Sequence, residues 1–159
     1  MPSKYKNIKV VWCKECDTWF RKDKVQEGVI LNWSLHLELF PKHTVLYLFD
    51  SIKEAEFYKE LVLRKKAGDI EDFKVKPKIT VWAEKNNDDT ALIFYCWDKD
   101  TPVNKKDFEK QFTYIPDFVI YDEEGNTEII DVKSEPTQTP IFRLKKRILE
   151  ALGLKIILK

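Results

Sequence analysis

The chain has 159 residues, of which 43% are hydrophobic and 35% are charged, a composition typical of a folded, soluble protein. Its formal net charge of +1 provides no overall attraction to polyanions, so nucleic-acid binding would have to come from local basic patches. The three cysteines, the polar N-terminus and the lack of a long apolar run argue against a disulfide-stabilised, secreted or membrane protein, and we expect a cytoplasmic location.

The first fifty residues have a β-rich pattern. Residues 9–13 and 45–49 predict strands because they are rich in β-branched and aromatic residues. Large apolar residues alternate with polar ones over residues 31–39, which predicts an amphipathic strand. We therefore expect residues 1–49 to form a β-rich extension.

A helix and a hairpin are predicted next along the chain. Residues 51–67 carry apolar side chains at three- and four-residue steps, and Gly68 is placed to end the helix. Residues 72–83 and 91–97 then predict two strands of a hairpin, separated by the turn-prone residues 86–89.

A second hairpin precedes the last helix. Residues 112–121 and 127–132 predict its strands, and Gly125 in the turn between them can adopt the positive φ that such turns often need. A polar link then leads to a helix over residues 141–151 and to a short strand over residues 154–158.

The order of these elements predicts an α/β fold. From residue 51 onward it runs helix, strands, helix, strand, which favours a mixed central sheet flanked by helices. We expect one domain, residues 1–159, in which residues 50–159 form the core and residues 1–49 the extension.

The second hairpin carries the residues best suited to chemistry. Asp131 and Lys133 are two residues apart on a predicted strand, so both side chains leave one face while Ile130 and Val132 point into the core. Asp117 lies on the neighbouring strand. Two carboxylates and a backbone carbonyl, here that of Val132, are sufficient protein ligands for Mg²⁺ and for Mn²⁺ as its substitute. Such an ion assists phosphodiester hydrolysis, and the lysine could orient the attacking water or stabilise charge on the phosphate.

These residues carry a family resemblance. Pro116-Asp117, followed by Asp131-Val132-Lys133, resembles the PD-(D/E)XK nuclease motif. The resemblance implies a restriction-endonuclease-like core, metal binding by the two aspartates and assistance to the attack by Lys133. Asp131 is a departure, because the commoner residue at that position is glutamate.

The family also has a glutamate on its first core helix. Glu54 resembles that position and would be a further catalytic metal ligand, with Glu56 as the weaker candidate. The alternative is that Glu54 is a capping-box acid that reaches back to Ser51.

Within the superfamily the chain is most similar to small phage-type endonucleases that resolve branched DNA. The resemblance implies a magnesium-dependent, homodimeric Holliday junction resolvase of DNA recombination, located in the host-cell cytoplasm if phage-encoded. The alternatives are the same chemistry on another substrate (restriction-type, nicking or end-processing), or a non-catalytic zinc- and nucleic-acid-binding module.

Two helices carry basic clusters that suit DNA phosphates. On the last helix, a stripe of Ile141, Leu144, Ile148 and Leu152 would be buried and would leave the basic residues in solvent. The residues that we expect to contact DNA are Gln138, Thr139, Arg143, Lys145, Lys146, Arg147, Lys65 and Lys66. The alternative is that they form ordinary solvated helix faces and a polar loop.

Cys13 and Cys16 have the C-X-X-C spacing of half a zinc site. The remaining candidates are His36, His43 and Cys96, which contain no second matching pair. We therefore do not expect zinc at Cys13 and Cys16, and the alternative is a strand-end turn with two buried thiols.

Overall fold

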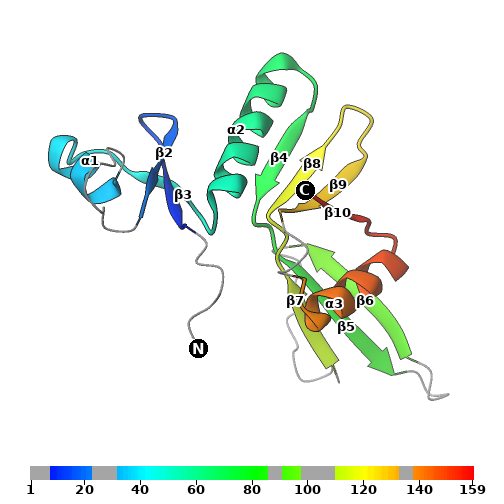
Figure 1. Ribbon diagram of the computed structural model, residues 1–159. Helices are drawn as coiled ribbons and strands as arrows, with labels where there is room; N and C mark the ends of the chain where they lie inside the picture. Colours follow the sequence, from blue (N-terminus) through cyan, green and yellow to red (C-terminus); the bar gives the residue numbers. More distant parts are fainter. Residues whose placement is uncertain (1–7, 23–31, 86–90, 98–109, 133–137) are drawn as a thin grey trace, which may run out of the picture. The chain divides into compact units, whose positions relative to one another are not determined.

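The computed structural model describes residues 8–22, 32–85, 91–97, 110–132 and 138–159 (Figure 1). Over these residues the fold is α/β with an N-terminal β-rich region, as predicted from the sequence, and it contains three helices where the sequence predicted two. The chain divides into two compact units, Met1–Lys66 and Ala67–Lys159. No helix in the described ranges is both long enough and apolar enough to cross a membrane.

The first unit contains a small antiparallel sheet with strand order β2-β1-β3. The elements of this unit are β1 (Val10–Cys13), β2 (Thr18–Arg21), α1 (Trp33–Leu39), β3 (Val45–Phe49) and α2 (Ile52–Ala67). The central strand β1 is buried throughout. Trp12 on β1 packs edge-on against Tyr58 of α2 with ring centroids 4.7 Å apart, and Phe49 of β3 lies 5.4 Å from the same ring. These aromatic contacts form the core of the unit.

The prediction of a strand over residues 31–39 is wrong, because Trp33–Leu39 is helical. The Asn32 side chain accepts a hydrogen bond from the backbone N–H of Ser34 at 2.6 Å and so caps the helix start. Leu35 and Leu39 are both exposed. The alternating leucines therefore do not mark the buried face of a sheet.

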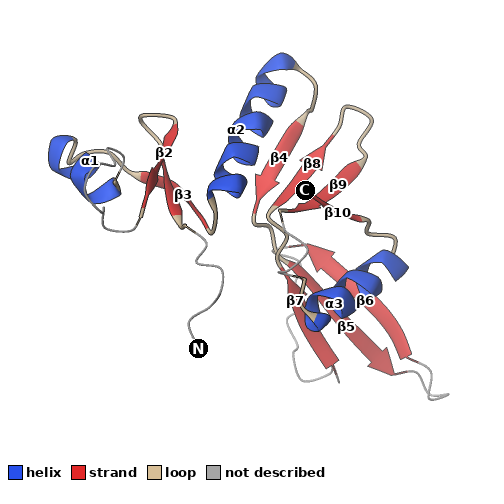
Figure 2. Ribbon diagram, in the orientation of Figure 1, coloured by secondary structure: helices blue, strands red, loops and turns tan. Residues whose placement is uncertain are grey.

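The second unit contains two sheets and α3 (Pro140–Ala151) (Figure 2). The mixed sheet has the order β10-β9-β8-β4, in which only the β10–β9 pair is parallel. Its strands are β4 (Asp72–Val75), β8 (Phe118–Tyr121), β9 (Thr127–Asp131) and β10 (Ile156–Leu158). The other sheet is antiparallel with the order β6-β5-β7. Its strands are β5 (Ile79–Lys85), β6 (Ala91–Trp97) and β7 (Lys110–Tyr114).

One hydrophobic core joins the two sheets to α3. Phe142 and Leu149 of α3 are buried in a cluster with residues of both sheets. The members from the sheets are Ile79, Val81, Tyr114, Val119, Ile129 and Ile156. The helix therefore holds the sheets together through one apolar face.

Two predicted strands are each divided in the structure. Residues 72–83 form β4 and β5, because Lys76 has a φ of 49° and Pro77 has no N–H to continue a strand ladder. Residues 112–121 contribute to β7 and β8, which belong to different sheets. The prediction of one continuous strand is wrong in both places, whereas the two hairpin pairings, β5 with β6 and β8 with β9, are confirmed.

Candidate functional site

The two predicted aspartates lie together at one end of the β8–β9 pair. The antiparallel register sets Phe118 opposite Ile130, and one further step along it sets Asp117 opposite Asp131. Asp117 Oδ2 accepts a hydrogen bond of 2.7 Å from the backbone N–H of Val132. Asp117, which immediately precedes β8, therefore lies against the end of β9 beside Asp131.

The backbones of both aspartates are held from the outer strands of the sheet. Lys76, just after β4, donates its N–H to the Asp117 carbonyl at 2.9 Å. Lys159, just after β10, donates its N–H to the Asp131 carbonyl at 3.1 Å. The acid pair is therefore built on four adjacent strands, which restrict its motion.

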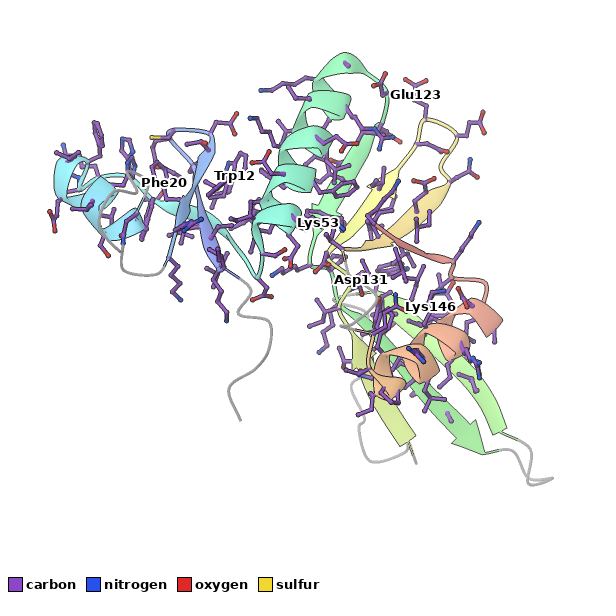
Figure 3. The ribbon with its side chains drawn as sticks, in the orientation of Figure 1. Trp12, Phe20, Lys53, Glu123, Asp131 and Lys146 are labelled. Atoms are coloured by element: carbon purple, nitrogen blue, oxygen red, sulfur yellow. The ribbon has the colours of Figure 1, made fainter. Side chains whose placement is uncertain are left out.

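Asp131, labelled in Figure 3, is only 1% exposed. The hydroxyl of Tyr114, at the end of β7, donates to Asp131 Oδ2 at 2.5 Å. Burial, together with this bond to Asp131, raises the pKa of Tyr114, which keeps the hydroxyl protonated as a donor. A buried carboxylate needs such partners, because its removal from water is costly.

The prediction that Ile130 and Val132 point into the core is confirmed, but the prediction that Asp131 leaves the opposite face toward solvent is wrong. Ile130, Asp131 and Val132 are all buried, because β9 lies between β8 and β10 and residues of α3 and the second sheet pack against this region. Tyr114 was absent from the predicted site. Its position three residues before Asp117 is the one signal in the sequence that could have suggested a role.

The oxygen donors of this site suit a hard divalent cation. Asp117 is half-buried and Asp131 fully buried, and carboxylate oxygens are the ligands that Mg²⁺ prefers. Val132, whose carbonyl is predicted as a ligand, contributes its N–H to the Asp117 carboxylate. Lys133 lies outside the described residues.

Glu54 forms the capping box that the sequence left open as an alternative. Its carboxylate accepts from the backbone N–H of Asp50 at 3.1 Å and from the Ser51 hydroxyl at 3.2 Å. Its own N–H donates to the Ser51 hydroxyl oxygen at 3.1 Å, so the two residues cap α2 reciprocally. Glu54 belongs to the first unit, and its role as a metal ligand stays a prediction. Glu56 accepts a hydrogen bond from the Trp19 indole.

The predicted buried stripe of α3 is rotated relative to the observed one. Ile141 and Leu144 are 68% and 60% exposed, whereas Phe142 and Leu149 are buried. Lys145 is half-buried, donates to the backbone carbonyl of Thr113 at 2.9 Å and lies over the Phe112 ring at 5.5 Å. The prediction that Lys145 points to solvent is wrong, because α3 turns this side chain toward β7.

The other predicted DNA-contacting residues differ in their surroundings. On α3, Arg143 and Arg147 are exposed, and Lys146 pairs with Glu150 at 2.9 Å. Thr139 caps α3 by accepting from the Phe142 N–H at 3.2 Å. The remaining residues are the half-buried Gln138 and the exposed Lys65 and Lys66, the last of which lies 3.9 Å from Asp17. Arg143 and Arg147 are therefore the exposed basic residues of α3 that could meet a phosphate.

A second cluster of chemistry-bearing residues lies in the first unit. Cys13, Cys16, His36 and His43 place one ligand atom each within 4.8 Å of one another, an arrangement able to hold a metal ion. The sequence-based expectation that the cysteines lack a second pair is wrong. The six residues between the histidines exceed the usual spacing of a zinc pair, and the bend after α1 brings the two rings together.

The contacts within this cluster are close. The Cys13 sulfur lies 3.7 Å from His36 Nε2 and 3.6 Å from His43 Nδ1, and the Cys16 sulfur lies 3.6 Å and 3.3 Å from the same two atoms. The two ring nitrogens are 3.0 Å apart. Burial, with a contribution from neighbouring His43, lowers the pKa of His36 and favours a neutral ring. Desolvation and the Cys13 thiol raise the pKa of Cys16.

The fold and these two sites define an α/β protein with a carboxylate pair on a mixed sheet and a Cys₂His₂ cluster in its N-terminal unit. Residues 42–155 match the family described as "Protein of unknown function (DUF1064)". This match spans more than half of the chain, and the chain belongs to that family. No curated protein and no solved structure matches the chain.

Proposed function

We propose that this protein is a magnesium-dependent endodeoxyribonuclease of the PD-(D/E)XK type, which cuts branched DNA in the manner of a Holliday junction resolvase. The observation that carries the proposal is the position of Asp117 opposite Asp131 at one end of the β8–β9 pair. Two neighbouring carboxylates suit a hard divalent cation, which prefers oxygen ligands.

Each residue of the site would have a separate task. Asp117 and Asp131 would hold Mg²⁺, or Mn²⁺ in its place, which when bound lowers the pKa of a coordinated water and neutralises charge on the phosphate. The Val132 N–H orients the Asp117 carboxylate, and the Tyr114 hydroxyl orients that of Asp131. Lys133 would stabilise the charge that develops on the phosphate as its bond to the leaving oxygen breaks.

The preference for branched DNA and a two-fold dimer come from the resemblance to phage-type resolvases. Arg143 and Arg147 on α3 are exposed, which supports contacts with the phosphate backbone of DNA. Such contacts position a nucleic acid without reading its sequence. A homodimer suits a four-way junction because one active site meets each of two opposed strands.

A cleavage assay tests the proposal. The protein is incubated with synthetic four-way junctions and with matched linear duplexes, in Mg²⁺, Mn²⁺ or EDTA. We expect metal-dependent cutting of the junction, its loss in Asp117→Asn and Asp131→Asn, and retained cutting in Glu128→Gln. Glu128 is the matched control, because it is an exposed acid on the same strand as Asp131.

The outcomes separate the alternatives. Equal cutting of junction and duplex would keep the nuclease and remove the junction preference. Absence of cutting on every substrate with either metal would refute the enzyme and leave a non-catalytic binding module. DNA binding by Asp117→Asn should persist, since loss of a carboxylate reduces repulsion with the phosphates.

A further inference from the structure

The Cys₂His₂ cluster has the donors and spacings of a tetrahedral zinc site. With Zn–S bonds of about 2.3 Å and Zn–N bonds of about 2.0–2.1 Å, tetrahedral geometry separates sulfur from nitrogen by about 3.6 Å and the two nitrogens by about 3.3 Å. The four sulfur–nitrogen distances of 3.3 to 3.7 Å lie around the first value, and the nitrogen–nitrogen distance of 3.0 Å lies near the second. Thiolate and imidazole ligands favour zinc over the hard ion of the acid pair.

The four ligands come from separate elements that meet at this point. Cys13 ends β1, Cys16 lies in the turn that leads to β2, His36 lies on α1 and His43 follows α1 on the way to β3. Cys13 and His36 are buried, so two of the donors are already removed from water.

Helix α1 has little other burial to attach it to the sheet. It has only seven residues, too few to be stable as an isolated helix. Its one buried residue is His36, whose ring stacks on Phe20 of β2 with centroids 4.0 Å apart, while Leu35 and Leu39 are exposed. Trp33 adds a second ring contact with Phe20 at 5.9 Å, so His36 is the buried link between the helix and the sheet.

The surrounding hydrogen bonds hold the ligands in place. Glu15, between the two cysteines, accepts from the N–H and the hydroxyl of Thr44, each at 2.7 Å, and from the Cys13 thiol at 3.4 Å. The Lys14 N–H donates to the Thr44 carbonyl at 3.0 Å. Because Thr44 directly follows His43, these contacts tie the cysteine turn to the histidine loop. Outer contacts of this kind orient metal ligands.

We propose that Cys13, Cys16, His36 and His43 bind one structural Zn²⁺ ion, which fastens α1 to the β1–β2 turn. Four protein ligands fill the tetrahedral shell and leave no position for a reacting water, so the ion is structural rather than catalytic. Cys13, Cys16 and His36 precede residue 42, where the family match begins, and only His43 lies within the match.

Metal analysis of the full chain tests the ligand set. Purified protein in a non-thiol reductant is expected to hold one zinc per chain, and Co²⁺ exchanged into it should give the intense visible absorption of tetrahedral thiolate coordination. Cys16→Ser should lose most of the zinc, and this exposed residue is chosen to spare the core. Cys96→Ser is the matched control, because Cys96 lies outside the cluster, and it should keep the full amount. Absence of zinc from the wild type, or equal zinc in the two variants, would overturn the proposal.

Amide hydrogen exchange tests whether zinc fastens α1. Removal of zinc from the wild type with a chelator should speed amide hydrogen exchange across α1 and leave exchange in α3 unchanged, and readdition of Zn²⁺ should reverse the effect. Unchanged exchange in α1 after complete removal would refute the structural role. Asp117→Asn should keep its zinc, so failure of the nuclease proposal and failure of this one are distinguishable.

Discussion

Removal of the Tyr114 hydroxyl tests how the buried Asp131 carboxylate is stabilised. Tyr114→Phe leaves the ring and its packing in place and deletes only the donor to Asp131 Oδ2. Tyr114 is 5% exposed and Asp131 is 1% exposed, so water does not readily replace the lost bond. A hydrogen bond to a charged group contributes about 1.5–3 kcal/mol, and we expect the free energy of unfolding to fall by about 2 kcal/mol.

Urea denaturation followed by circular dichroism measures this change. The midpoint should fall while the slope with urea stays the same, because the variant exposes the same surface on unfolding. Tyr95→Phe is the control, since Tyr95 is more than a third exposed, and it should change the free energy of unfolding by less than about 0.5 kcal/mol. A Tyr114→Phe variant as stable as this control would refute the assignment of the hydroxyl as a needed partner.

Two further predictions concern acids with structural roles. Glu54→Gln should keep the stability of the wild type, because glutamine also serves in a capping box, whereas Glu54→Ala should lose about 0.5–2 kcal/mol in urea denaturation. Equal loss in both variants would contradict the capping role. Bonds from Asn126 hold the pKa of Asp122 below its usual value. The stabilisation of the folded state by the Asp122 carboxylate is therefore present above the pKa of an unfolded aspartate. It is lost as the pH falls through the lowered pKa of Asp122 in the folded protein. Asp122→Ala should thus be less stable than wild type at neutral pH, and the difference in their free energies of unfolding should disappear in acid. A difference that does not change with pH would argue against this linkage.

The β8–β9 hairpin and the acid pair could be predicted because they depend on residues that are close together in the sequence. Gly125, with a φ of 80°, and Asp122, which accepts three hydrogen bonds within the turn from Glu124 and Asn126, set a tight connection. Once the turn is set, the antiparallel register follows, and Asp117 comes opposite Asp131.

The burial of that pair could not be predicted in the same way. Alternation along β9 indicates two faces but does not say what covers each of them. Tyr114 belongs to β7, a strand of the other sheet, and packing through α3 decides that its hydroxyl reaches Asp131. The rotated stripe of α3 has the same origin, since periodicity gives the spacing of apolar residues but several overlapping stripes satisfy it.

The sequence by itself determined the α/β class, the two longer helices and the β8–β9 hairpin with its two aspartates, because these depend on helical periodicity and on residues joined by a short turn. Only the tertiary structure decided that His36 and His43 meet Cys13 and Cys16. The Cys₂His₂ cluster joins a strand, a turn, a short helix and a loop that are distant in sequence. These segments are brought together by the pairing of β1 with β3 and by the stacking of His36 on Phe20. The spacing of the four residues in the sequence does not predict these contacts.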